Sequence, residues 1–138
     1  MTLTRITNIK TNYDTWLRII RQEETESPLQ GIIPFEPDIR YWFNVTDLKP
    51  ILGVKHFTYI YPYVGHKRKD ARAFFPFVEY TNYITLTDLI KILESDRFNH
   101  SLGGINWLLN KVIPNLDTLN FITGSEYYQN RLKGIWPN

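Results

Sequence analysis

The residues of this chain whose chemistry stands out lie in one basic segment, from Lys55 to Arg72. Its cationic side chains are Lys55, Lys67, Arg68, Lys69 and Arg72, and Asp70 is its single carboxylate, which leaves four net positive charges. His56 and His66 lie in the same segment and add charge at low pH. Lysines and arginines grouped in this way are typical of sites that contact phosphates, because each contact releases condensed counterions. The segment therefore predicts contacts to a polyanion, and a solvated turn is the alternative that the charges alone leave open.

Aromatic residues are interleaved with these cations. Phe57, Tyr59, Tyr61 and Tyr63 alternate with other residues, a pattern that favours a strand, although a buried helix remains an alternative. Alternation would place all four rings on one face, which we interpret as core. Stacking of an exposed ring on an unpaired base is the other interpretation, and Tyr59 is the candidate for that contact.

The sequence indicates neither catalysis nor a metal site. We find no nucleophile paired with a base, no phosphate-binding loop and no carboxylate pair in an identifiable setting. Glu94, Ser95, Asp96 and His100 carry suitable atoms, but they follow an expected helix end, where polar residues meet water. His56, His66 and Asp70 lack the short spacings of zinc ligands, and the chain has no cysteine. We therefore expect no enzymatic activity, no metal and no cofactor.

Composition indicates one domain over residues 1–138. A hydrophobic content of 43% is enough for one core at this length. The absence of cysteine suits a reducing compartment, and no apolar run resembles a signal peptide or a membrane span, so we expect a soluble intracellular protein without membrane contact. Every charged residue from Glu23 to Asp38 is acidic, so opposite charges are separated along the chain.

Hydrophobic periodicity and turn residues predict an α+β fold. Tyr13, Trp16, Leu17 and Ile20 have helical spacing and predict an N-terminal helix. Strands are expected over 31–33, 39–43, 74–80 and 83–85, and further helices over 46–53, 86–94, 102–113 and 125–132. We expect a small antiparallel sheet with several short helices packed against it, in a single compact domain.

Three segments, in this order, resemble the N-terminal domain of the Bro proteins, the baculovirus repeated open reading frame family, which is related to the viral and phage KilA-N domain. They are Trp42 to Val54, Ile84 to Leu93, and Ile105 to Pro114 with its Trp107. The Bro-N-like region covers residues 38–115, with an N-terminal helical extension and a C-terminal tail. The resemblance implies a DNA-binding domain of viral type, without catalysis, that acts in gene regulation or viral replication in the host cytoplasm or nucleus.

We therefore predict a non-enzymatic nucleic-acid-binding domain. Its expected phosphate contacts are Lys55, Lys67, Arg68, Lys69 and Arg72, with His56 as a helper and Tyr59 as a base contact. The alternative is a protein-interaction or assembly module with an aromatic binding surface, which exposure of Trp16, Trp136 or several tyrosines in one patch would favour. The sequence does not distinguish DNA from RNA, single from double strands, or a monomer from a homo-oligomer.

Overall fold

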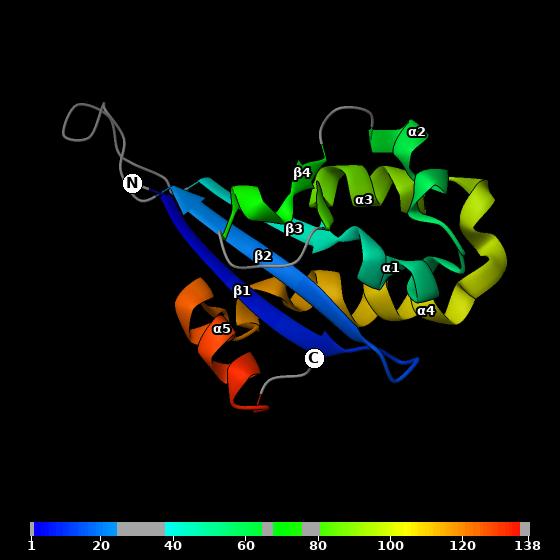
Figure 1. Ribbon diagram of the computed structural model, residues 1–138. Coiled ribbons are helices and arrows are strands. Elements are labelled where there is room, and N and C mark those ends of the chain that lie inside the picture. Colours follow the sequence, from blue (N-terminus) through cyan, green and yellow to red (C-terminus); the bar gives the residue numbers. More distant parts are fainter. Residues whose placement is uncertain (1, 25–37, 65–67, 76–80, 136–138) are drawn as a thin grey trace, which may run out of the picture.

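A six-stranded antiparallel sheet forms the centre of the computed structural model, which describes residues 2–24, 38–64, 68–75 and 81–135 (Figure 1). The strand order is β4-β5-β3-β2-β1-β6. The strands are β1 (Thr2–Lys10), β2 (Trp16–Glu24), β3 (Asp38–Asn44), β4 (Lys69–Asp70), β5 (Asn82–Thr85) and β6 (Ile122–Thr123). All neighbouring pairs are antiparallel. The predicted α+β class with an antiparallel sheet is confirmed.

The N-terminal helix predicted from Tyr13 to Ile20 is wrong, because β1 and β2 form a hairpin there. Leu17 and Ile19 are buried on one face of the sheet, and Ile20 is buried on the other. Since both faces of this strand are covered, apolar residues occupy both alternating sets of positions and imitate helical spacing. The hairpin closes where the backbone N–H of Thr11 donates to the carbonyl of Thr15 at 2.8 Å.

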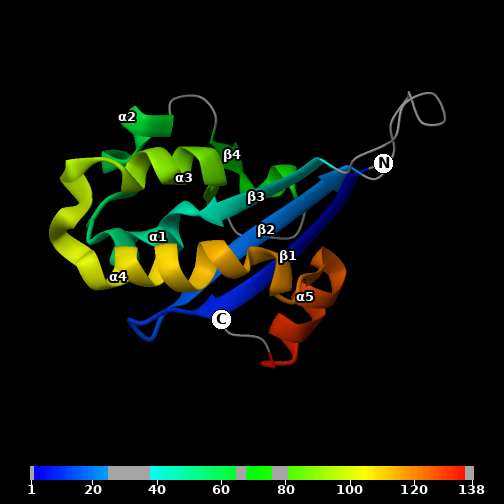
Figure 2. The same ribbon diagram turned by 180° about the vertical axis from the view of Figure 1, so that it is seen from behind.

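One face of the sheet carries the main core. It is covered by α1 (Val45–Leu52), α3 (Leu86–Leu93) and α4 (Leu102–Trp107), and Figure 2 shows α4 running across the strands. From α4 the chain continues through a π-helical turn, Leu108–Val112, and a 3-10 segment, Ile113–Thr118. Side chains with no exposed surface in this core include Phe43, Leu48, Ile51, Leu52, Ile84, Leu89, Ile92 and Leu108.

The opposite face carries a smaller core. It is covered by α5 (Gly124–Leu132) and by a 3-10 turn, Ala71–Ala73, with the residues that follow it. Ile6, Ile20, Trp42, Ala71, Phe75, Tyr83 and Tyr127 make up this cluster. Because it covers only part of the face, the remaining part near the β1–β2 hairpin is lined by polar side chains.

Local capping explains why three predicted helices are confirmed within one or two residues. The side chain of Thr85 accepts a hydrogen bond from the backbone N–H of Asp88 at the start of α3, and that of Thr123 caps α5 in the same way. Helix α1 is capped by Asn44, two residues before the expected start, and ends at Gly53, whose φ of 71° is left-handed. None of the described helices is long and apolar enough to span a bilayer.

Two other predictions had different outcomes. The single helix expected over 102–113 is divided into α4 and the π-helical turn, and Pro114 lies at the start of the 3-10 segment. Of the strand expected over 74–80, Phe74 and Phe75 are not in a strand, and residues 76–80, like the strand expected over 31–33, lie outside the described residues.

Candidate functional site

The aromatic segment after α1 is not a strand. A 3-10 turn, Phe57–Tyr59, is followed by the short helix α2 (Tyr61–Val64). Ile60 and Val64, four residues apart, are buried and take the core positions, so the prediction that the tyrosines share a core face is wrong. Tyr59 is 57% exposed, whereas Tyr61 and Tyr63 are half-buried against the main core.

Hydrogen bonds hold this segment against the sheet edge and against the end of α3. The hydroxyl of Tyr61 accepts from Nδ2 of Asn82 in β5 at 3.0 Å. The hydroxyl of Tyr63 accepts from Oγ of Ser95 at 3.1 Å, and its ring meets Phe98 at 5.5 Å between centroids. The half-buried tyrosines therefore fix the segment that presents Tyr59 to solvent.

A histidine contacts the exposed tyrosine, and two cations belong to the same stretch of chain. Lys55 and His56 are exposed, and the His56 ring meets the edge of Tyr59 at 5.9 Å between centroids. The guanidinium of Arg68 lies over the Tyr61 ring, 3.8 Å from its centroid. We call Lys55, His56, Tyr59, Tyr61 and Arg68 the aromatic platform. The sequence from Val54 to Lys69 has no acidic residue, and the first carboxylate after it, Asp70, pairs with Arg72.

The other predicted phosphate contacts do not join this platform. Lys69 is in the edge strand β4, and its Nζ lies 5.5 Å from the Trp42 ring centroid, on the side of the smaller core. Arg68 and Lys69 lie on opposite sides of the edge because consecutive residues of an extended chain alternate. Arg72 pairs with Asp70 at 3.1 Å, and the backbone N–H and guanidinium of Arg72 lower the pKa of that carboxyl. Lys67 and His66 lie outside the described residues.

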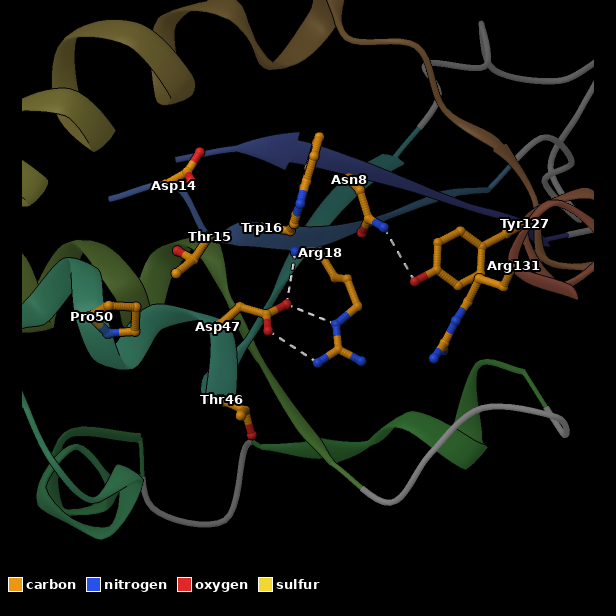
Figure 3. Close-up of a pocket in the computed structure, with 10 residues that line it drawn as sticks. All are labelled: Asn8, Asp14, Thr15, Trp16, Arg18, Thr46, Asp47, Pro50, Tyr127 and Arg131. Carbon is orange, nitrogen blue, oxygen red and sulfur yellow. Dashed lines mark hydrogen bonds and ion pairs between the residues drawn. The ribbon is translucent and has the colours of Figure 1, made fainter. Parts of the chain in front are cut away.

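A polar pocket of about 520 Å³ lies on the face of the smaller core, a site that the sequence analysis did not predict (Figure 3). Asn8 and Arg18, which are partners across β1 and β2, form its floor. β2 also contributes Trp16, α1 contributes Pro50, and α5 contributes Tyr127 and Arg131. Figure 3 shows the amide of Asn8 directed at the Tyr127 hydroxyl, with the guanidinium groups of Arg18 and Arg131 in the same space.

Arg18 is fixed in this pocket by Asp47 in the first turn of α1. Its Nε and Nη2 donate to the two carboxylate oxygens at 2.7 and 3.0 Å. Its backbone N–H also donates to Oδ2 of Asp47 at 2.9 Å. Burial by itself would lower the pKa of Arg18, but the hydrogen bonds and the negative charge of Asp47 outweigh burial and raise the pKa. Arg18 is therefore a rigid cation.

Asn8 is the least satisfied group of the pocket. It is only 8% exposed, and its Nδ2 donates to the hydroxyl of Tyr127 at 3.4 Å. Its Oδ1 accepts no hydrogen bond from any described residue. A signal for this site existed in the sequence, since Asn8 and Arg18 interrupt the apolar residues of β1 and β2, but the incorrect helix prediction concealed it.

Comparisons with family models, with curated proteins and with solved structures find no match to this chain. The resemblance to the Bro N-terminal domain therefore stays a prediction. In the described part of the chain, no three His, Asp or Glu side chains gather as metal ligands would.

Proposed function

We propose that this chain binds nucleic acid through the aromatic platform, with Tyr59 stacking on an unpaired base and with Lys55 and Arg68 contacting phosphates. The exposure of Tyr59 carries this proposal. A tyrosine that is 57% exposed, next to His56 and in a stretch without carboxylates, has no evident role in packing. Ring faces stack on any base, and nearby cations add affinity that does not depend on sequence.

The arrangement favours unpaired strands over duplexes. Stacking requires a base outside a double helix, and the hydrogen bonds of Tyr61 and Tyr63 hold the segment that carries Tyr59. Lys69 and Arg72 contribute less, because Lys69 lies on the other side of the edge and Arg72 pairs with Asp70. In the Bro and KilA-N setting implied by the resemblance, such binding would serve gene regulation or viral replication.

Fluorescence anisotropy with labelled oligonucleotides tests this proposal. Single-stranded and duplex DNA and RNA are compared at low and at physiological salt. We expect Tyr59→Ala to weaken single-strand binding by at least about ten-fold, given roughly 1–3 kcal/mol per stacked base. The matched control is Tyr128→Ala, which removes another exposed tyrosine, on α5. Absence of binding at low salt, or equal affinity of Tyr59→Ala and wild type, would overturn the proposal.

A protein-interaction module is the second candidate function. Leu132 at the end of α5 and Ile135 just after it are 68% and 69% exposed, and Tyr128 lies one turn before Leu132. Trp16 is half-buried at the polar pocket, and Trp136 lies outside the described residues. If this apolar end joins two copies of the chain, light scattering will show an oligomer that Leu132→Ser dissociates.

A further inference from the structure

The polar pocket combines three kinds of recognition group that no packing role explains together. A buried amide oxygen lacks a donor, two guanidinium groups face the same space, and an indole lines the side. The pocket lies on the face opposite the main core, away from the aromatic platform, so ligand binding in it is independent of the proposed function.

The amide oxygen of Asn8 favours a ligand that carries an N–H group. Asn8 is nine-tenths buried, and its amide oxygen has no donor. This is unfavourable, because the oxygen loses its hydrogen bond to water on folding and no protein group replaces it. The hydrogen bond from Nδ2 to Tyr127 holds the amide in place, and Oδ1 is buried at the floor of the pocket without a donor, so a ligand N–H that reaches it supplies the missing hydrogen bond. Amino and ring N–H groups of nucleobases supply such donors.

The guanidinium groups of the pocket favour an anionic ligand. Arg18, Arg131, Asp14 and Asp47 line the pocket and balance in charge, and Lys10, which lies outside the lining, adds one positive charge beside it. Asp14 pairs with Lys10 at 2.7 Å, and Asp47 holds Arg18. Guanidinium groups match phosphate oxygens in geometry, and Asp47 holds the guanidinium of Arg18 in place through Nε and Nη2.

The volume of the pocket and the ring of Trp16 restrict the class of ligand that it can bind. A volume of about 520 Å³ lies in the range of small-ligand sites. The indole of Trp16, which lines the pocket, offers an apolar surface suited to a flat ring. We propose that the polar pocket binds a nucleoside monophosphate, with the base between Asn8 and Trp16 and the phosphate near Arg18 and Arg131. The nucleotide is either free or the terminal unit of a strand, since both have the same chemistry.

Calorimetric titration with the four ribonucleoside monophosphates tests this site. We expect at least one of them to bind at least about ten-fold more tightly than its nucleoside, ribose 5-phosphate or inorganic phosphate. Only the nucleotide carries both the base for Asn8 and the phosphate for Arg131. Arg131→Gln and Asn8→Ala should each weaken it by about ten-fold or more. Lys133→Gln, which changes an exposed cation directly after α5 and outside the pocket lining, is the matched control.

Three results would overturn this inference. They are no binding by any nucleoside monophosphate, equal binding of ribose 5-phosphate or inorganic phosphate, and wild-type affinity of Arg131→Gln. Arg131 is on a helix surface, so its variant reports on the site even where Asn8→Ala unfolds the protein. Tyr59→Ala should leave nucleotide binding unchanged, which separates failure of this site from failure of the aromatic platform. Tighter binding of a 5′-phosphorylated trinucleotide than of the monophosphate assigns the site to a strand end, and the reverse assigns it to free nucleotide.

Discussion

Arg18 in β2 and Asp47 in α1 are joined by three hydrogen bonds, two from the guanidinium and one from the backbone N–H of Arg18. Strand β3 pairs with β2 only as far as Ile19, and the chain then turns into α1. Arg18, the next residue of β2, therefore has no pairing partner in β3, and the carboxylate of Asp47 accepts the hydrogen bond from its backbone N–H. One ion pair therefore satisfies a backbone N–H of β2 beyond the end of β3, positions α1 and fixes a cation in the polar pocket.

Asp47→Ala should lower the free energy of unfolding by about 2–4 kcal/mol, because it leaves a largely buried guanidinium and a backbone donor without an acceptor. Urea denaturation measures this loss. The control is Asp38→Ala, which breaks an exposed pair with Arg40 at 3.8 Å and should cost less than about 1 kcal/mol. Equal losses in the two variants would contradict the structural role of Asp47.

Gly104→Ala should destabilise the protein by about 1–3 kcal/mol, as overpacking does. A Cβ atom on Gly104 would overlap the carbonyl of Ile51 and lie 2.8 Å from the Tyr13 ring, so α4 would have to move away from α1. Gly103→Ala is the matched control, because its Cβ would lie 3.6 Å from the Tyr13 hydroxyl, an ordinary contact. Helix propensity should make that variant more stable by up to about 1 kcal/mol. Thermal unfolding of both tests the close approach of the helices.

Tyr83 should make stability fall at high pH. Burial raises the pKa of Tyr83 to about 12, although the positive charge of Arg18 lowers it in part. The pKa of a tyrosine in the unfolded chain is about 10. A raised folded-state pKa gives stability that is fully present below about pH 10 and is lost as pH rises toward 12. Between these values wild type should lose about 2–3 kcal/mol relative to Tyr83→Phe. Urea denaturation of both proteins at several pH values cancels other titrations, and parallel curves would contradict this account.

The salt dependence of nucleic-acid binding should separate the two sides of the β4 edge. Arg68→Gln should reduce the slope of log affinity against log salt by roughly 0.7, the contribution of one phosphate contact on a single strand. Lys69→Gln should change the slope less, because Lys69 lies over Trp42 and Phe74 on the other side. Anisotropy titrations at four salt concentrations give these slopes. Equal effects of the two variants would contradict this separation and would show that the nucleic acid contacts both sides of the β4 edge.

Local sequence determined α1, α3 and α5 and the total charge of the basic segment. Thr85 with Asp88, and Thr123 with Glu126, form hydrogen bonds over three residues, so these starts depend on neighbours in the chain alone. The left-handed Gly53 at the end of α1 is another local signal.

Only the tertiary structure decided the rest. Leu17 and Ile20 became strand residues because both faces of the sheet found partners, which periodicity in one chain segment does not reveal. Tyr59 became exposed because Ile60 and Val64 took the core positions. Arg68, directly before β4, lies over Tyr61, whereas Lys69 at the start of β4 lies over Trp42, so neighbours in the sequence are on opposite sides of the edge. The polar pocket joins Asn8 to Tyr127, 119 residues apart, and such long-range contacts exist only once the sheet has formed and α5 has packed on it.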